Sequence, residues 1–442
     1  MSAKALPGFR DFYPQEFAER AYIFRVWREV AARYGFVEYD GPPLEPLDLY
    51  TKKSGDEIVG QLYNFTDKGQ REVALRPEMT PTFARLVGAK ANALRKPVRW
   101  FSIPQLFRYE RQQRGRLREH FQLNVDLVGE ADVTADAELL AVAVDIMRGF
   151  GLTERDVRAR VSDRRLLAAL LRGMGLTDAE LPAAYAAVDK VEREPREVLV
   201  DRLREHGVAR EAAQRLLDLV ARPASVEALR EEFGADPAVA EALDRLARYR
   251  EYCDALGVGA WVALDLSIVR GLAYYTGIVF ELFDAKGEFR AICGGGRYDN
   301  LLAALGGADL PALGFGMGDV VLGELLRDRG LMPAAGSALD YWVEVDPSAA
   351  RGELRAMRLA AKLRASGARV EYPLRAQAVG KQKKAAFHAG ARRIVRLVAP
   401  DGEPGGDEGD EYEIEVVADG SRTRVRGDGW MTGAGTTTPT DG

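Results

Sequence analysis

A block of helical sequence interrupts a strand-rich chain, and this interruption constrains the fold more than any other feature. From about Ser162 to about Leu256 the sequence is rich in Leu, Ala, Arg and Glu at the spacing of amphipathic helices. Strand-like runs precede the block, and two more, WVALDLSIV and GIVFELF, follow it directly. The 442 residues exceed what one hydrophobic core usually organises. We therefore expect a strand-rich domain that is split by a helical insertion.

A second, smaller domain is predicted after the linker MPAAGSA, where strand and helix patterns alternate as in α/β folds. The last 12 residues, MTGAGTTTPTDG, contain too few apolar groups to order themselves. These patterns predict five segments. They are 1–161 and 257–330 as the two parts of the split domain, 162–256 as the insertion, 338–430 as the α/β domain, and 431–442 as a disordered tail.

The composition excludes several classes of protein. Cys253 and Cys293 lie far apart, so a disulfide framework and a four-cysteine zinc site are both ruled out, and three histidines leave little for metal chemistry. The N-terminus lacks the apolar stretch of a secretion signal, and no run approaches 18 apolar residues. We expect a cytoplasmic protein that does not cross a membrane.

The net charge of -5 conceals two basic segments. Residues 95–118 contain eight Lys or Arg against the single acid Glu110, and residues 338–400 contain thirteen against five Asp or Glu. Basic surfaces on an acidic protein indicate contact with a polyanion, because each neutralised phosphate releases counterions. For the second segment, solvated helix faces are an equally acceptable interpretation.

Two strand-like segments, VRWFSIPQLFRYE and HFQLNVDLVG, flank the polar stretch RQQRGRLRE and predict an antiparallel hairpin with a long basic tip. Alternate residues of a strand share a face, so Arg108 and Glu110 point together, as do Gln122, Asn124 and Asp126. Polar groups on one face of apolar strands are costly to bury without a partner. This face therefore predicts a ligand pocket.

This hairpin resembles motif 2 of class II aminoacyl-tRNA synthetases, and the other motifs resemble those of one family among them, the histidyl-tRNA synthetases. GFVEYDGPPLE, with Pro42, has the form of motif 1, and LGFGMGDVVL stands where motif 3 belongs. LRPEMTP, RGLAYYTGIVFE and GGGRYDNL resemble the family's histidine-site motifs. The resemblance covers almost the whole chain, and the ordered set is far more specific than any single motif.

The resemblance implies an α+β fold, with a class II antiparallel-sheet catalytic domain, a helical insertion and a C-terminal α/β anticodon-binding domain. The implied activity is ATP-dependent ligation of L-histidine to tRNA(His) through a histidyl-adenylate, which releases AMP and diphosphate. ATP and Mg²⁺ are the implied cofactors. A homodimer is implied because motif 1 is an interface element in class II enzymes.

The resemblance also implies roles for individual residues. Arg108 and Arg270 would act as the catalytic pair on opposite sides of the ATP α-phosphate. Tyr274 and Tyr275 would enclose the imidazole of histidine. The implied ATP-binding residues are Arg108, Glu110, Arg116 and Arg270. The implied histidine-binding residues are Glu78, Met79, Thr80, Arg108, Gln122, Asp126, Arg270, Tyr274 and Tyr275. No metal ligand is predicted among the protein side chains.

The chemistry explains why two arginines are wanted. Attack of the histidine carboxylate on the α-phosphorus spreads charge over the phosphate oxygens, so positioned cations matter more than an acid or a base. Gly294, Gly295 and Gly296 lack a Cβ and would let the backbone approach the bound ligand. Taken alone, the tyrosine pair is more typical of a core, the glycine run of a turn, and His120 of a structural or tRNA-facing residue.

One segment departs from the family pattern. Motif 3 usually ends in Gly-x-Glu-Arg, whose arginine contacts the ATP γ-phosphate, but here Gly318 to Val321 places valine at that position. Arg327 is six residues further on and should face differently. Either other groups bind the γ-phosphate, or the chain is a silent histidine-binding regulatory paralogue of histidine biosynthesis. That paralogue is expected to lack a C-terminal domain, so an active enzyme is the favoured interpretation.

Overall fold

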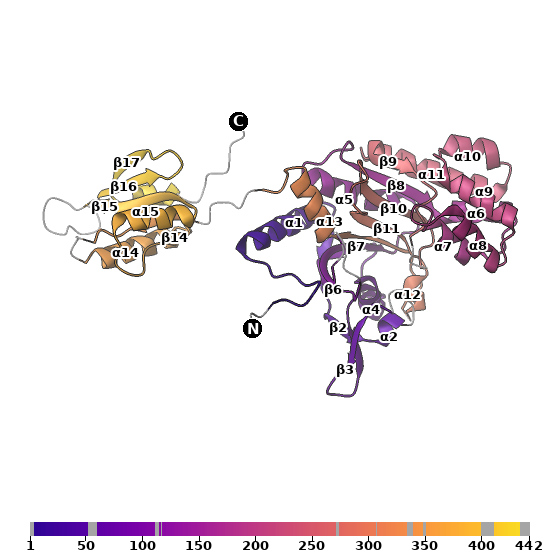
Figure 1. Ribbon diagram of the computed structural model, residues 1–442, viewed down its shortest axis with the longest axis horizontal. Helices are drawn as coiled ribbons and strands as arrows, with labels where there is room; N and C mark the ends of the chain where they lie inside the picture. Colours follow the sequence, from indigo (N-terminus) through magenta and orange to yellow (C-terminus); the bar gives the residue numbers. More distant parts are fainter. Residues whose placement is uncertain are drawn as a thin grey trace. The chain divides into compact units, whose positions relative to one another are not determined.

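The computed structural model describes residues 4–51, 60–110, 115, 117–270, 274–305, 307–333, 339–347, 351–398 and 411–433. The chain forms two compact units, Met1–Met332 and Pro333–Gly442. Figure 1 shows the large sheet and its helices in the first unit and a small α/β sheet in the second. Among the described residues no helix is both long and apolar enough to cross a membrane.

The first unit is built on a sheet of nine described strands, most of them antiparallel. The order is β1-β5-β7-β12-β11-β10-β8-β9, and β6 pairs with β7 beside this row. Strands from before and after the helical block therefore pair with one another in one sheet, which gives the predicted α+β class. The strands are β1 (Val37–Glu38), β5 (Val98–Ser102), β6 (Gln105–Phe107), β7 (Glu119–Val128), β8 (Val157–Asp163), β9 (Val262–Leu264), β10 (Ile278–Asp284), β11 (Cys293–Arg297) and β12 (Ala312–Gly318).

Three helices pack against one another and against this sheet: α1 (Pro14–Arg33), α5 (Thr134–Gly149) and α13 (Asp319–Asp328). The apolar residues of 16–34 recur at helical spacing and predict one helix. The structure confirms this helix as α1, which buries Trp27 completely. Helix α5 is apolar over most of its surface, and its burial on nearly every side follows from that composition. The three helices and the inner face of the sheet share one hydrophobic core.

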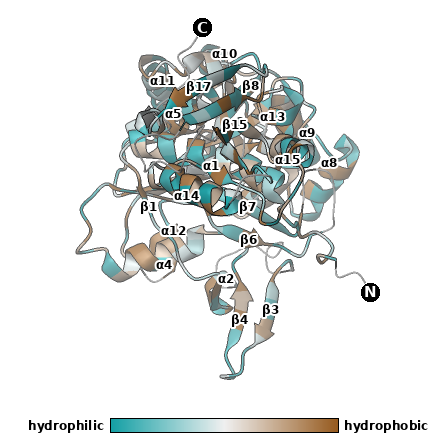
Figure 2. Ribbon diagram, turned by 90° about the vertical axis from the view of Figure 1, so that its left-hand side faces the viewer, coloured by the Kyte–Doolittle hydropathy of each residue, from teal (hydrophilic) through white to brown (hydrophobic). Residues whose placement is uncertain are grey.

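A small three-stranded sheet, ordered β2-β4-β3, carries the segment that leads to the site. It consists of β2 (Leu44–Pro46), β3 (Tyr63–Thr66) and β4 (Glu72–Leu75). Figures 1 and 2 both show the β3–β4 hairpin projecting from the body of the first unit. The short helices α2 (Asp48–Thr51) and α12 (Leu301–Ala304) each contact α4 (Thr80–Lys90).

The helical block folds into six described helices at the β8–β10 end of the sheet (Figure 1). The sequence predicts Asp163, Thr177 and Asp236 as helix caps, because Asp and Thr are favoured at that position. Asp163 and Asp236 do cap two of the helices, since each side chain accepts a hydrogen bond from a backbone N–H in the first turn. Thr177 does not, because the helix that follows it has Glu180 at its N-cap. The block shares the hydrophobic core of the large sheet. Its helices are α6 (Arg164–Gly173), α7 (Leu181–Val188), α8 (Arg196–Glu205), α9 (Arg210–Ala221), α10 (Val226–Phe233) and α11 (Pro237–Ala255), followed by the short helix η1 (Gly259–Trp261).

The second unit is a five-stranded sheet in the order β14-β13-β15-β16-β17 with two helices. Strand β13 is parallel to both β14 and β15, which suits the predicted α/β pattern. Its elements are β13 (Leu339–Glu344), α14 (Gly352–Ala365), β14 (Val370–Glu371), α15 (Val379–His388), β15 (Ala391–Val398), β16 (Glu411–Val416), β17 (Arg422–Arg426) and η2 (Gly429–Gly433).

One boundary of the predicted tail is wrong. Met431, the first residue of the expected disordered segment 431–442, lies in η2 and is only 5% exposed. Its side chain packs in the core of the second unit beside Tyr341 and Tyr412. The sequence misplaced it because a single apolar residue in a Gly- and Thr-rich run gives no periodic signal. Residues 434–442 lie outside the described part of the chain.

Candidate active site

The polar face of β7 is positioned by glycines on the neighbouring strand β12. In the antiparallel register Gln122 lies opposite Gly318, Asn124 opposite Gly316 and Asp126 opposite Gly314. A Cβ atom on Gly314 would lie 2.3 Å from Asp126 Oδ1, and one on Gly316 would lie 2.2 Å from Gln122 Nε2. Real Cβ atoms essentially never come this close to an atom to which they are not bonded. The glycines of LGFGMG therefore create the room that the polar side chains of β7 occupy.

Asp126 is almost fully buried and accepts a hydrogen bond from the hydroxyl of Tyr298. Burial raises the pKa of Asp126 to about 7, and the hydrogen bond from Tyr298 opposes this rise. Its second oxygen, Oδ2, has no hydrogen-bond partner among the described residues. An unsatisfied buried carboxylate oxygen suits a site that receives a hydrogen-bond donor from a ligand.

Tyr298 links Asp126 to the predicted tyrosine pair. The Tyr274 ring lies 5.8 Å from that of Tyr298 and 5.0 Å from that of Tyr275, measured between ring centres. The negative charge of Glu78 contributes to raised pKa values of Tyr274 and Tyr275, although burial is the larger cause for both. Five side chains from four separate segments thus form one cluster, which consists of Glu78, Asp126, Tyr274, Tyr275 and Tyr298. Tyr298 is not among the residues predicted from the sequence, although it follows the GGGR run directly.

Arg270 has an unusual backbone conformation, with φ of 57° in the left-handed region. Its guanidinium group lies 3.0 Å from Glu281 and 5.6 Å from the centre of the Tyr275 ring. Burial lowers the pKa of Arg270, but the charges of Tyr275 and Glu281 outweigh this effect, and the pKa lies above the ordinary value. The guanidinium therefore stays charged in a partly buried position.

The glycine run of β11 makes room for protein atoms. A Cβ on Gly294 would lie 1.4 Å from Arg270 Nη1, so this glycine gives the arginine its place. A Cβ on Gly295 would lie 2.4 Å from the backbone oxygen of Gly314, and one on Gly296 would lie 2.6 Å from that of Ile278. These two glycines permit close packing of adjacent strands. Gly294 also lines the large cavity described below, and its close approach to a bound ligand stays a prediction.

Arg108 follows β6 and connects the hairpin to the LRPEMTP segment. Its Nε donates a hydrogen bond to the carbonyl oxygen of Pro77 (2.9 Å), and its Nη1 lies 4.0 Å from Glu110 Oε1. Glu78 is 5% exposed and Thr80 begins α4. Met79 is fully buried, with its sulfur 3.8 Å from Arg76 Nη1.

A cavity of about 860 Å³ gathers part of the predicted set. Arg108, Glu110, Gln122 and Arg270 all line it, although they come from separate segments. Asp126, Tyr274 and Glu78 lie in the buried cluster and are absent from the described lining. Arg116, predicted to bind ATP, falls outside the described residues. Two cations, Arg108 and Arg270, thus lie at an open cavity, next to the buried cluster that contains Asp126.

Comparison with known proteins decides the family. The sequence profile of the histidyl-tRNA synthetase family matches residues 8–318. The chain belongs to the histidyl-tRNA synthetase family.

Relatives of this histidyl-tRNA synthetase family member span nearly its whole length. It is 48% identical over 404 residues to the histidine–tRNA ligase of Opitutus terrae, which covers 90% of this chain and 91% of the relative. It is 39% identical over 427 residues to the histidine–tRNA ligase of Haloarcula marismortui, with 95% of each chain covered.

Solved structures share the fold at lower identity. The histidyl-tRNA synthetase of a Nostoc species gives a TM-score of 0.79 at 22% identity, covering 96% of this chain and 97% of that one. A Bacillus halodurans protein described as an ATP phosphoribosyltransferase regulatory subunit/histidyl-tRNA synthetase gives 0.73 at 22% identity, covering 89% and 98%. At 22% identity, these two similarities show a shared fold and nothing about function.

The structure places the residues at which the chain departs from motif 3 of the histidyl-tRNA synthetases. Asp319 is buried and accepts hydrogen bonds from the Phe121 backbone N–H (2.9 Å) and from Arg10 Nη1 (2.9 Å), so it joins α13 to β7 and the N-terminal segment. Val321 lines the 860 Å³ cavity. Arg327 pairs with Glu19 at 2.7 Å and does not belong to that lining, as its spacing from Val321 predicts.

His120 also lines this cavity, where sequence analysis gave it no ligand role. Burial lowers its pKa to about 3, and the positive charges of Arg108 and Arg10 add to this effect. The imidazole is therefore neutral at physiological pH. Its position on β7, one residue before Phe121, gave no signal because polar and aromatic residues alternate irregularly there.

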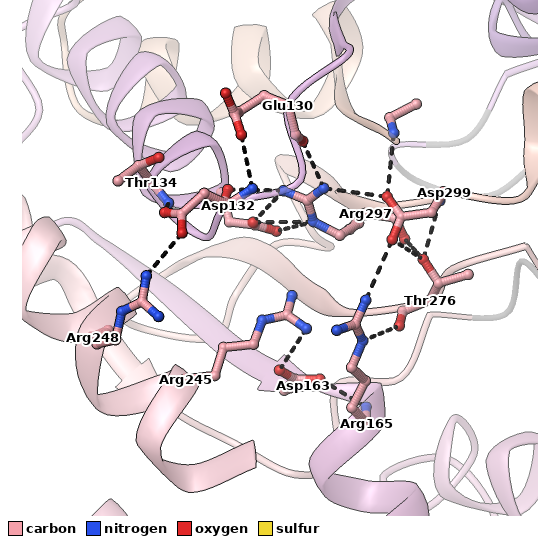
Figure 3. A network of polar contacts seen from close by, with 12 residues as sticks. Glu130, Asp132, Thr134, Asp163, Arg165, Arg245, Arg248, Thr276, Arg297 and Asp299 are labelled. Atoms are coloured by element: carbon pink, nitrogen blue, oxygen red, sulfur yellow. Dashed lines mark hydrogen bonds and ion pairs between the residues drawn. The ribbon is translucent and has the colours of Figure 1, made fainter. Parts of the chain in front are cut away.

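Arg297, the residue before Tyr298, takes part in a network of buried polar contacts (Figure 3). Arg297, at the end of β11, is fully buried and lies 2.5 Å from Asp136 in the first turn of α5. It also donates to the carbonyl oxygens of Glu130 and Asp132 and contacts Asp299. This network fixes the turn that carries Tyr298. In the sequence, Arg297 stands out only as part of the glycine-rich motif GGGRYDNL, and no local pattern indicates its buried partners.

Proposed function

We propose that this chain joins L-histidine to tRNA(His) in two steps. Histidine and ATP form histidyl-adenylate and diphosphate, and the histidyl group then passes to the tRNA with release of AMP. One observation carries the proposal within this family: Arg108 and Arg270, more than 160 residues apart, line the same cavity together with Gln122. Two guanidinium groups at one open cavity suit the binding of a phosphate that is under attack.

The first step needs positioned charge. As the histidine carboxylate attacks the α-phosphorus, Arg108 and Arg270 would hold the phosphate oxygens in line and stabilise the charge that develops on them. In the free protein each arginine faces a carboxylate, Glu110 at 4.0 Å and Glu281 at 3.0 Å. These carboxylates hold the guanidinium groups near the cavity before the nucleotide arrives.

We expect Mg²⁺ to bind at this site together with the nucleotide. Among the described residues there is no cluster of three or more His, Cys, Asp or Glu side chains that could hold a metal ion. Mg²⁺ commonly binds through one or two carboxylates plus substrate phosphates. Glu110 and Glu281 line the cavity and would supply such carboxylates. The ion would neutralise charge on the triphosphate.

Histidine recognition is assigned to the buried cluster. Asp126, with its unsatisfied Oδ2, would accept a hydrogen bond from the substrate, and Tyr274 and Tyr275 would enclose the imidazole. A site whose buried polar groups need partners rejects amino acids that cannot supply them, by roughly 10⁴-fold or more. Glu78, Thr80 and Gln122 would contact the amino group and neighbouring polar atoms.

The pH dependence of histidine binding tests this assignment. Because the pKa of Asp126 is raised to about 7, histidine affinity should rise as the pH increases through 7 and the carboxylate ionises. Asp126→Asn should remove this step and weaken binding about 10- to 100-fold at pH 8. Tyr298→Phe removes a hydrogen bond that lowers the pKa, so the step should move to higher pH.

Calorimetric titration with histidine between pH 5.5 and 8.5 measures these effects. The substrate's own imidazole titrates in every sample, so the difference between wild type and Asp126→Asn isolates the protein carboxylate. Identical pH profiles for wild type and both variants would show that Asp126 does not contact the substrate.

Contact with tRNA is proposed for both basic segments. In the second segment, fewer cations are available for tRNA than the sequence alone indicates. Many of the arginines and lysines of 338–400 are paired within the second unit, for example Lys383 with Glu415 at 2.8 Å and Arg396 with Glu344 at 2.6 Å. On α15, Lys381 and Lys384 are exposed beside Phe387, which is 70% exposed. Lysines and an exposed aromatic ring on one helix suit RNA phosphates and an unstacked base.

A homodimer and a cytoplasmic location complete the proposal. Helix α1 belongs to the motif 1 segment, and Tyr13 and Phe17 at its start are 70% and 51% exposed. Exposed aromatic side chains on such a helix are typical of a subunit interface. The free, buried thiols of Cys253 and Cys293 suit a reducing compartment.

Histidine-dependent pyrophosphate exchange and charging of tRNA(His) by the purified protein test the whole proposal. Both reactions should occur, and exchange should depend on histidine, ATP and Mg²⁺. Folded protein that binds histidine but catalyses neither reaction would instead identify the histidine-binding regulatory paralogue. The observation that favours this second function is the valine at position 321, where motif 3 of the family has an arginine.

A further inference from the structure

An arginine from another segment, Arg290, lies beside Val321 in the wall of the cavity. Arg290 and Val321 both line the 860 Å³ cavity. A Cβ placed on Gly115 would lie 3.4 Å from Val321 Cγ2 and 3.8 Å from Arg290 Cδ. The two side chains therefore lie around the same point, one from the start of α13 and one from the connection between β10 and β11.

The backbone that carries Arg290 is fixed on both sides. The buried carboxylate of Asp284, at the end of β10, accepts hydrogen bonds from the N–H groups of Glu288 (3.1 Å) and Phe289 (2.9 Å). After Arg290, the N–H of Ile292 donates to the carbonyl oxygen of Leu282 (2.8 Å). A residue held between two such anchors projects its side chain into the cavity from a defined position.

The charges of the cavity distinguish Arg290 from the other cations that line it, which are Arg108, Arg193 and Arg270. Arg108 and Arg270 face Glu110 and Glu281. Within the described residues, Arg193 and Arg290 have no carboxylate within 4.0 Å. The charge of Arg193 acts on Glu281, which places it near Arg270. Glu288 and Glu324 also line the cavity. Arg290 is thus the cation beside Val321 that forms no ion pair within 4.0 Å among the described residues, although carboxylates share its cavity.

We propose that Arg290 binds the terminal phosphate of ATP, at the part of the cavity where Val321 supplies no charge. This inference rests on the proposed function, since it takes ATP as the ligand of the cavity. A guanidinium group binds a phosphate through two parallel hydrogen bonds, which an alanine or valine cannot replace. Arg108 and Arg270 would hold the α-phosphate, and Arg290 would hold the far end of the triphosphate.

Direct binding measurements separate this role from catalysis. In the absence of histidine, ATP with Mg²⁺ and AMP are each titrated into wild type and Arg290→Ala by calorimetry. The variant should bind ATP about 10- to 100-fold more weakly, because it loses hydrogen bonds to a charged group. It should bind AMP, which has no terminal phosphates, with unchanged affinity. Arg290 is exposed, so this substitution should leave the fold intact.

Two single variants and one double variant sharpen the test. Arg327→Ala removes an exposed arginine that pairs with Glu19 outside this cavity, and it should leave both affinities unchanged. Val321→Arg in the Arg290→Ala background should restore part of the ATP affinity, because it places a guanidinium group at the same point. Arg193→Ala should lack the ATP-specific loss seen with Arg290→Ala.

Three results would overturn the inference: an unchanged ATP affinity in Arg290→Ala, an equal loss for ATP and AMP, or a terminal-phosphate loss in Arg193→Ala alone. The measurement needs only nucleotide binding. A protein that bound ATP through Arg290 yet gave no pyrophosphate exchange would contradict the proposed function and still support this inference.

Discussion

Replacement of Arg270 by alanine is expected to slow histidyl-adenylate formation by about 10³-fold or more, by analogy with other arginines that stabilise phosphoryl transfer. Histidine affinity should change far less, because the buried contacts of Asp126 and Tyr274 would remain. The reason is geometric: the Arg270 guanidinium lies at the cavity wall above Gly294 and next to Glu281. Its charge would act chiefly on the α-phosphate in the transition state.

Single-turnover adenylate formation and equilibrium histidine binding, measured on the same preparations, separate the two effects. An equal loss in both quantities would remove the catalytic role of Arg270. Arg172→Ala, at a half-exposed arginine that pairs with Asp178 on the helical block, serves as a charge-matched control and should leave the rate unchanged.

Gly294→Ala offers a second way to displace the same guanidinium. The new Cβ would collide with Arg270 Nη1, the end of a flexible side chain, so the arginine should move while the fold is kept. A misplacement of this kind costs about 10²-fold in rate. Gly295→Ala provides the contrast, because its Cβ would meet the backbone oxygen of Gly314 at 2.4 Å. That variant should lose stability.

Removal of Arg297 should destabilise the first unit by about 3–5 kcal/mol, the usual cost of leaving one partner of a buried ion pair alone. Arg297 is fully buried and holds Asp136, two carbonyl oxygens and Asp299 together (Figure 3). In Arg297→Ala the carboxylate of Asp136 would stay in a site where burial already raises its pKa. The network joins the turn of Tyr298 to α5, so histidine binding should weaken too.

Urea denaturation followed by tryptophan fluorescence measures this loss as a change in the free energy of unfolding. Arg248→Ala is the matched control, because this arginine pairs with Asp132 in the same region but is half exposed, and its removal should have little effect. The double variant Arg297→Met, Asp136→Leu should recover much of the stability, since apolar residues can replace a buried ion pair. A small effect of Arg297→Ala would contradict the structural role.

Local sequence patterns determined much of the architecture, because they depend on periodicities that neighbouring residues share. The apolar stripe of 16–34 predicted α1, and the alternation in 120–129 predicted that Gln122, Asn124 and Asp126 share one face. The turn and cap residues Asp163 and Asp236 predicted helix starts for the same reason. Arg108 and Arg270 required more, since only the resemblance to a family linked two such distant segments.

The tertiary structure alone decided which side chains meet. Tyr298 reaches Asp126 across 172 positions of sequence, and Arg297 reaches Asp136 across 161. Arg290 comes to lie beside Val321 because the connection after β10 is anchored by Asp284. The need for glycine on β11 and β12 becomes apparent only when the neighbouring strands and side chains are in place. Periodicity fixes the face on which a residue lies, but the partner across the sheet is set by strand order, which no local pattern encodes.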